Sequence, residues 1–152
     1  MALFLVQHGK TAESDDPERG LSDEGRADVT RIGTVAKGYG VAPARIFHGG
    51  KPRAKETAKL LAELLAPAGG VVARQGLAPG DDPGALRAYL DPAENLMLVG
   101  HVPFLEQLTG LLVTGTAERR VVRFQPGGIV CLDREPERRS WFVKWMLQPH
   151  ID

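Results

Sequence analysis

Short runs of consecutive apolar residues alternate along the first two thirds of the chain with segments whose apolar residues recur every three or four positions. The apolar runs are residues 2–7, 45–48, 71–73 and 96–99. Runs of this length predict strands that are buried on both faces. The segments with helical spacing begin after Ser22, at Pro52, near Pro83 and at Phe104. Strand and helix therefore alternate four times.

The last third of the chain has a different pattern. Residues 121–124, 129–133 and 140–146 read as three successive strands joined by turns, with no helix between them. Alternating strands and helices predict a parallel sheet with helices on both faces, and successive strands predict antiparallel additions at its edge. We therefore expect a three-layer α/β/α fold in a single domain, residues 1–152. Trp141 and Trp145, four apart in a strand, should face the same side.

Composition narrows the class of protein. The 152 residues include 19 basic and 19 acidic side chains, so the formal net charge is zero. Binding to nucleic acids or to a membrane surface usually needs a basic excess, and neither is expected. The single cysteine, Cys131, cannot form an internal disulfide and suits a reducing compartment. No signal peptide or membrane span is evident, so we expect a cytoplasmic monomer.

Residues with chemical potential follow each predicted strand. His8 comes after the first strand, Arg53 after the second, Asp81 and Asp82 after the third, and His101 after the fourth. Ligands of open α/β sheets bind beyond the carboxyl ends of the strands. The sequence therefore predicts that two histidines, an arginine and a carboxylate pair meet at one edge of the sheet.

These side chains together suit phosphoryl transfer. A neutral imidazole such as His8 can act as a nucleophile near pH 7, and a protonated His101 could stabilise the phosphoryl group during transfer. Arg53 offers a planar fork of donors to phosphate oxygens. Gly9 would let the backbone approach a ligand closely. The chemistry needs no metal or other cofactor, and the sequence shows no spacing of metal ligands.

At these positions the sequence resembles a known family. Gln7-His8-Gly9 is similar to the Arg-His-Gly signature of the histidine phosphatase superfamily, also called the phosphoglycerate mutase-like fold. Residues 53–57, Arg-Ala-Lys-Glu-Thr, match its Arg-Ala-x-x-Thr motif, and His101 matches its second histidine. The chain looks most like the short bacterial SixA-type phosphohistidine phosphatases, and the resemblance covers nearly all of it.

The resemblance implies a role for each matched residue. His8 would attack phosphorus and become phosphohistidine, while His101 and Arg53 would hold the phosphoryl oxygens. Gln7, Gly9 and Arg19 would contact the substrate. The proton donor would be Asp82, with Asp81 as the alternate, although an aspartate before Pro83 is also a good helix N-cap.

The sequence departs from the family at two positions of this site. Gln7 stands where the family has arginine, and Gly49 stands where it usually has serine. A neutral hydrogen bond contributes roughly 1 kcal/mol and a charged one roughly 1.5–3 kcal/mol. Replacing arginine by Gln7 would therefore slow the reaction by about 5- to 30-fold without abolishing it.

The substrate that the resemblance implies is phosphohistidine on a phosphorelay-type protein. Its leaving group is an imidazole, which needs far less help from a proton donor than an alkoxide does. Two alternatives remain open. The chain could hydrolyse small phosphate monoesters, or it could be a catalytically weak module that binds a phosphate or a phosphoprotein.

Overall fold

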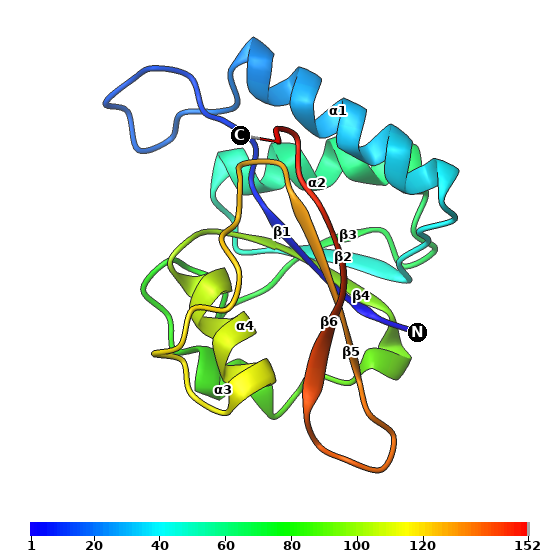
Figure 1. Ribbon diagram of the computed structural model, residues 1–152. Helices are drawn as coiled ribbons and strands as arrows, with labels where there is room; N and C mark the ends of the chain where they lie inside the picture. Colours follow the sequence, from blue (N-terminus) through cyan, green and yellow to red (C-terminus); the bar gives the residue numbers. More distant parts are fainter. Residues whose placement is uncertain (152) are drawn as a thin grey trace.

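A six-stranded sheet forms the centre of the molecule, for which the computed structural model describes residues 1–151 (Figure 1). The strands are β1 (Leu3–Gln7), β2 (Arg45–His48), β3 (Val71–Ala73), β4 (Leu96–Gly100), β5 (Ile129–Arg134) and β6 (Trp141–Leu147). Their order across the sheet is β3-β2-β4-β1-β5-β6. The first four in this order are parallel, and β5 and β6 add antiparallel pairs at one edge.

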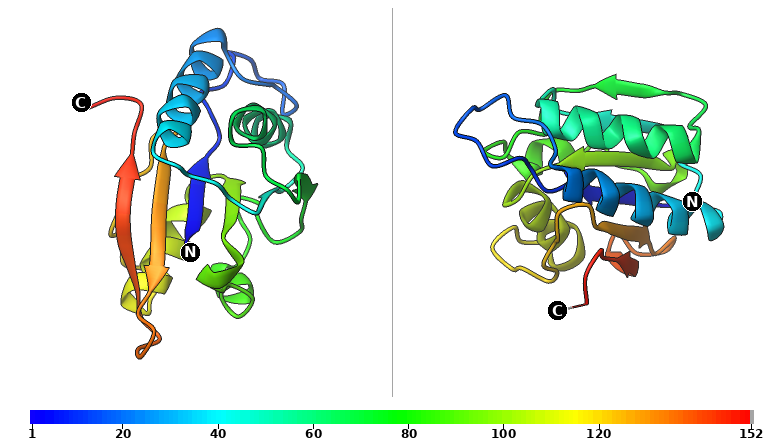
Figure 2. Two further views of the ribbon diagram at one scale, coloured as in Figure 1. Left: turned by 90° about the vertical axis from the view of Figure 1, so that its right-hand side faces the viewer. Right: turned by 90° about the horizontal axis from the view of Figure 1, so that it is seen from above.

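Helices cover both faces of this sheet, as Figure 2 shows from two directions. The helices are α1 (Asp23–Gly38), α2 (Pro52–Leu65), α3 (Pro83–Arg87) and α4 (Phe104–Thr114), and a 3₁₀ turn, η1 (Pro92–Glu94), precedes β4. Helices α1 and α2 pack on one face, and α3 and α4 pack on the other. The predicted three-layer α/β/α fold with antiparallel edge strands is confirmed.

Strand β1 shows why both layers are needed. All five of its residues are buried, so neither of its faces meets water. Phe4 and Val6 pack into the core beneath α1 and α2, whereas Leu3 and Leu5 pack into the core beneath α3 and α4. Strict alternation of side chains across a strand produces this division. Both faces of β1 therefore carry apolar side chains, and this explains the unbroken apolar run in the sequence.

The pairing of β1 with β4 places the two histidines that were singled out from the sequence. The two strands are parallel neighbours, and Gln7 lies opposite Gly100. His8 and His101 are the next residues on each strand, so both emerge at the same edge of the sheet. The backbone N–H of His8 donates to the carbonyl of Gly100 at 3.0 Å and holds the two strand ends together.

The strand predicted at residues 121–124 is wrong. This segment pairs with no strand, because β5 occupies the free edge of β1 and β6 follows it. Side chains satisfy its backbone instead: the N–H of Phe124 donates to Glu106 Oε2 at 3.0 Å, and the carbonyl of Arg123 accepts from Gln148 Nε2 at 2.8 Å. The β propensity of the segment serves only to bury Phe124.

The expectation that the two tryptophans share a face is also wrong. Trp141 packs in the core beneath α3 and α4, whereas Trp145 packs against the core beneath α1 and α2. The register of β6 against β5 shifts between them, as one residue is inserted in β6. Such a bulge reverses the side on which all later residues of the strand project.

Within residues 1–151, no helix has both the length and the apolar character needed to cross a membrane.

Candidate active site

His8 lies half-buried just beyond β1, with its ring oriented by the backbone. Its Nδ1 lies 2.7 Å from the carbonyl oxygen of Gly9. A carbonyl only accepts hydrogen bonds, so Nδ1 carries the proton and Nε2 of the neutral ring keeps its lone pair. Burial lowers the pKa of His8, and the positive charges of Arg53 and Arg19 lower it further. His8 is therefore a neutral imidazole near pH 7, with Nε2 available to attack an electrophile.

His101 faces His8 across the ends of the two strands. The ring centroids are 5.0 Å apart and the planes are tilted by 54°. His101 is only 2% exposed, and its Nε2 is buried without a hydrogen-bond partner among the described residues. A buried polar atom left unpaired is costly, so this nitrogen is positioned for a group that arrives from outside.

The expected positive charge on His101 is absent from the free protein. Burial, followed by the charges of His8, Arg53 and Lys51, lowers the pKa of His101 to about 4. The prediction of a protonated His101 assumed an ordinary pKa, whereas burial and the nearby positive charges lower that pKa in the free protein; protonation with a phosphoryl group bound stays a prediction. A phosphoryl anion placed between the histidines would reverse part of this effect, because a nearby negative charge favours the protonated ring.

This low pKa makes stability depend on pH. Between pH 6.5 and about 4 the unfolded state binds a proton at His101 that the folded state does not. The contribution of neutral His101 to the free energy of unfolding is complete above pH 6.5, and it is lost as the pH falls from 6.5 to about 4. Urea unfolding at pH 7 and pH 4 should show a loss of about 3 kcal/mol from this group. The His101→Gln variant should lack that part of the loss; an equal loss in both proteins would contradict the assignment.

Two arginines supply positive charge beside the histidines. Arg53 lies in the first turn of α2, and its Nη1 donates to the carbonyl of Pro17 at 3.2 Å. Arg19 comes from the loop between β1 and α1, where its Nε donates to Thr11 Oγ1 at 3.3 Å. Burial lowers the pKa of Arg53, and so does the charge of Arg19. Two guanidinium groups that repel each other in this way form a site for an anion.

Thr57 joins the arginine helix to the histidine loop. Its hydroxyl accepts from the N–H of Gly9 at 2.9 Å and donates to the carbonyl of Arg53 at 2.8 Å. The residue is completely buried. Thr57 thus fixes the backbone of Gly9, whose carbonyl holds the ring of His8, and links it to α2. The sequence analysis gave Thr57 no role, although its position four residues after Arg53 on a helix already placed both on one face.

We expect Thr57→Val to lower kcat about tenfold and the free energy of unfolding by about 1–3 kcal/mol. The variant keeps the shape of the side chain but leaves the buried N–H of Gly9 without an acceptor. Thr57→Ser keeps the hydroxyl and is the matched control for rates measured with the same phosphorylated substrate. If the serine variant loses as much kcat as the valine variant, packing explains the effect and the hydrogen bond does not.

The two aspartates serve local structure. Asp82 caps α3 by accepting from the N–H of Gly84 at 2.9 Å, and Asp81 Oδ2 accepts from the N–H of Ala78 at 2.8 Å. The charges that shift the pKa values of His8 and His101 are all positive, and neither aspartate is among them. The capping role foreseen for Asp82 is confirmed, whereas its role as a proton donor stays a prediction.

Solved structures of other proteins share this fold over almost their whole length. A structure of the protein histidine phosphatase SixA with tungstate is 21% identical, with a TM-score of 0.85, and the match covers 98% of this chain and 97% of that chain. The chain has the histidine phosphatase fold. No protein-family model and no curated protein matches the sequence.

Two further structures show how far this resemblance extends. A protein from Agrobacterium tumefaciens that carries the name phosphohistidine phosphatase SixA is 21% identical, with a TM-score of 0.79 and 97% of each chain covered. One from Escherichia coli, named as an α-ribazole-5′-phosphate phosphatase, is 16% identical, with a TM-score of 0.73 and coverage of 100% of this chain and 98% of that chain. Proteins with different named substrates therefore share the histidine phosphatase fold.

Gln7 and Gly9, which were expected to contact the substrate, have different surroundings in this histidine phosphatase fold. Gln7 is 7% exposed, and its Oε1 is buried without a hydrogen-bond partner in the described part of the chain, so its contact with substrate stays a prediction. Gly9 gives its N–H to Thr57, and a Cβ on Gly9 would lie 2.8 Å from Val29 on α1. Close packing against α1 therefore requires this glycine, and its contact with substrate stays a prediction.

The other two histidines, His48 and His150, lie away from the pair formed by His8 and His101. His48 is buried at the end of β2, where its Nδ1 accepts from the N–H of Gly50 at 3.0 Å and shapes the turn before α2. His150 lies in the C-terminal segment, 3.1 Å from Asp28 on α1.

The side chains of Glu24, Asp28 and His150 converge, with ligand-type atoms within 4.8 Å of one another. The sequence gave no sign of this cluster, because His150 is distant along the chain. Its carboxylates already have cationic partners: Asp28 pairs with Arg31 at 3.1 Å and Glu24 with Lys10 at 2.8 Å. The cluster therefore acts as an ion-pair network that fastens the C-terminal segment to α1.

Proposed function

We propose that this chain is a phosphatase that hydrolyses phosphohistidine on a protein through a phosphorylated His8. The observation that carries the proposal is the state of His8: a neutral ring whose Nδ1 proton is held by Gly9, with Nε2 free. His101 and two guanidinium groups surround it. The histidine phosphatase fold, shared with structures named SixA, supports the same chemistry.

The reaction has two steps. His8 Nε2 attacks phosphorus, the new N–P bond forms, and the bond to the leaving nitrogen breaks with its electron pair passing to that nitrogen. Arg53 and Arg19 offset the charge on the phosphoryl oxygens, and His101 Nε2 contacts one of them. Water then attacks phosphorus, the N–P bond breaks with its electron pair returning to Nε2 of His8, and inorganic phosphate leaves with the protons of the water.

The arrangement of carboxylates favours phosphohistidine over phosphate esters. Asp81 and Asp82 are both engaged by backbone N–H groups of the turn before and within α3. A leaving imidazole has a conjugate acid of pKa about 6.5 and can depart with a proton from solvent, whereas an alkoxide needs a strong proton donor. A site in which both aspartates already have backbone partners suits the better leaving group.

Two peptides of one sequence test this preference, one carrying phosphohistidine and one carrying phosphoserine. We expect kcat/KM to be at least about 100-fold higher for phosphohistidine, a difference of about 3 kcal/mol in the barrier. Faster release from phosphoserine would overturn the substrate class while leaving the phosphatase intact. Release from neither peptide, with phosphate still bound, would show that the chain is a binding module.

Small phosphate monoesters are the second candidate substrates. The observation that favours them is that the α-ribazole-5′-phosphate phosphatase named above has the same fold. A panel of such esters belongs in the same assay. For either substrate, we propose a monomer that works in the cytoplasm with no metal or other cofactor.

Gln7→Arg tests the departure from the family motif. Arginine would add a charged donor beside the phosphoryl group, so we expect the rate to be unchanged or to rise by up to about 30-fold. Single-turnover rates with the phosphohistidine peptide measure the effect. A large fall would show that the amide of Gln7 has a dedicated role, since its unpartnered Oε1 is free to accept a hydrogen bond from the ligand.

A further inference from the structure

A cavity of about 740 Å³ lies between α3 and the hairpin that joins β5 to β6. Its walls come from two parts of the chain: the end of α3 with the residues after it, and the hairpin with the adjoining ends of β5 and β6. Its lining residues include Arg87, Arg134, Glu137, Arg138, Arg139 and Trp141. We call this cavity the arginine pocket. Its volume is that of a site for a small molecule of nucleotide size.

The arginines of the arginine pocket have few carboxylate partners to balance their positive charge. Among residues 1–151, Arg134 has one carboxylate partner, Asp91 at 3.7 Å, whereas Arg87, Arg138 and Arg139 pair with no carboxylate within 4.0 Å. Glu137 is the one acidic residue in the lining. The whole chain has zero net charge, so this local excess is not a general property of its surface.

One of these guanidinium groups is fixed in place. Arg134 lies over the ring of Trp141, 5.6 Å from its centroid, and Trp141 is only 6% exposed. A cation held on an aromatic face keeps its outer N–H groups free to donate. Arg87 stands on the α3 wall and Arg138 on the hairpin wall, so a ligand with a single charge would leave one wall without a partner.

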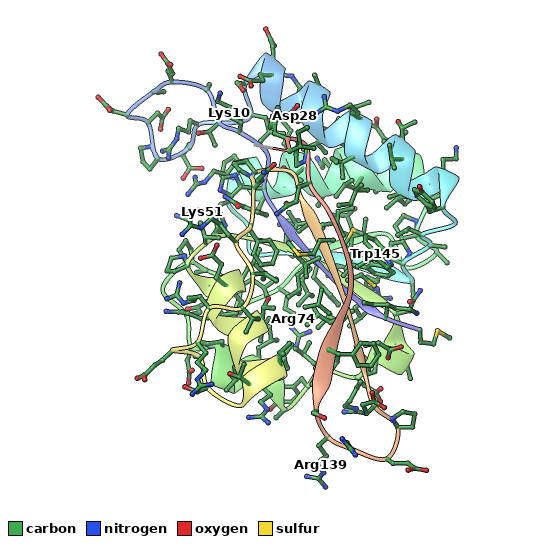
Figure 3. The ribbon with its side chains drawn as sticks, in the orientation of Figure 1. Lys10, Asp28, Lys51, Arg74, Arg139 and Trp145 are labelled. Carbon is green, nitrogen blue, oxygen red and sulfur yellow. The ribbon has the colours of Figure 1, made fainter. Side chains whose placement is uncertain are left out.

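The arginine pocket is separate from the site around His8. Strand β5 is antiparallel to β1, so Arg134 at its end lies beyond the start of β1, whereas His8 follows the end of β1. Five residues of strand span roughly 16 Å. Figure 3 shows the same separation, with Arg139 at the hairpin tip and Lys10, two residues after His8, towards the opposite end of the molecule.

We propose that the arginine pocket binds a small molecule that carries a diphosphate or triphosphate group. Guanidinium forks match phosphate oxygens in pairs, and linked phosphates bring the several charges that two walls of arginine need. A concave pocket of this volume suits a compact ligand better than an extended acidic peptide, which would run across an open surface.

Calorimetric titration with inorganic triphosphate tests the proposal, with the Arg53→Ala protein as the background so that the catalytic end lacks a guanidinium. We expect one triphosphate to bind each chain, with an affinity that falls as salt rises. Arg138→Ser with Arg139→Ser should weaken binding by about 30-fold or more, and Arg87→Ser alone by about tenfold or more. Both walls would then be shown to contribute.

The matched control removes two exposed arginines outside the pocket, as Arg119→Ser with Arg123→Ser. This variant should bind triphosphate as tightly as the background protein. The absence of binding would overturn the proposal, as would equal losses in the control and in the pocket variants. Tighter binding of a glutamate-rich peptide than of triphosphate would assign the pocket to a protein partner and reject the phosphate ligand.

Discussion

Replacing His8 with alanine is expected to lower phosphate release by about 10⁴-fold or more. In the proposed reaction the imidazole of His8 forms the N–P bond, and His101 Nε2 contacts a phosphoryl oxygen and does not attack phosphorus. Release measured under single-turnover conditions with a phosphohistidine peptide gives this ratio directly. The fold should survive, since the ring is only half-buried and its one hydrogen bond is to the neighbouring residue.

His48 offers a matched control for the loss of His8. It is the last residue of β2 in the parallel sheet and is buried, but its side chain binds only the turn that starts at Gly49. Asparagine can replace Nδ1 as the acceptor for the N–H of Gly50, so His48→Asn should keep activity within about threefold. If His8→Ala stays fully active, or if the two variants lose equal activity, the nucleophile assignment is wrong.

Replacing Arg53 with alanine is expected to lower kcat/KM by about 10²- to 10⁴-fold. The guanidinium would make two charge-assisted hydrogen bonds to the phosphoryl group, each contributing about 1.5–3 kcal/mol. Arg53→Lys keeps the charge but loses the planar fork, and we expect it to lie between the alanine variant and the native protein. Steady-state rates for all three proteins, with KM reported separately, measure the effect.

Two results would contradict this role of Arg53. Full activity of the alanine variant would show that Arg19 alone neutralises the phosphoryl group. A lysine variant as active as the native protein would show that charge matters and that the geometry of the fork does not. The hydrogen bond from Arg53 to the carbonyl of Pro17 also ends in either variant, so thermal unfolding should accompany the kinetics.

The sequence was sufficient to predict that His8, Arg53 and His101 lie together, but it also placed Asp81 and Asp82 with them, and the structure shows these two only in local hydrogen bonds. The four parallel strands were visible as short apolar runs, and the rule that ligands bind beyond the carboxyl ends of strands led to His8, Arg53 and His101. It did not determine that β1 and β4 are neighbours in the sheet, which is what places the two rings 5.0 Å apart. Strand order depends on contacts between distant segments that periodicity does not reveal.

Other features could not be predicted because they depend on packing. The charge state of His101 follows from its burial beside His8, Arg53 and Lys51, none of which is next to it in sequence. The inserted residue in β6 moves Trp145 to the opposite face without changing the apolar pattern. Residues 121–124 have the composition of a strand, but the edge they would need is already occupied by β5.

The hydrogen bonds that position His8 were the feature that was hardest to predict from the sequence. Thr57 contacts Gly9 across a sequence separation of 48 residues, so neither residue alone suggests the link. The histidine phosphatase fold brings α2 against the loop after β1, and only then does the hydroxyl of Thr57 meet the backbone N–H of Gly9. Hydrogen bonds of this kind belong to the tertiary structure and leave only a weak trace in local patterns.

Rapid quenching in base during turnover of a phosphohistidine peptide, followed by mass spectrometry and ³¹P NMR of the protein, tests the central claim most directly. The account predicts acid-labile, base-stable phosphate on Nε2 of His8, because the Nδ1 proton is held by the carbonyl of Gly9. The label should be absent from the His8→Ala protein. Phosphate release without any phosphorylated protein, or phosphate attached to His101 or to Nδ1 of His8, would contradict it.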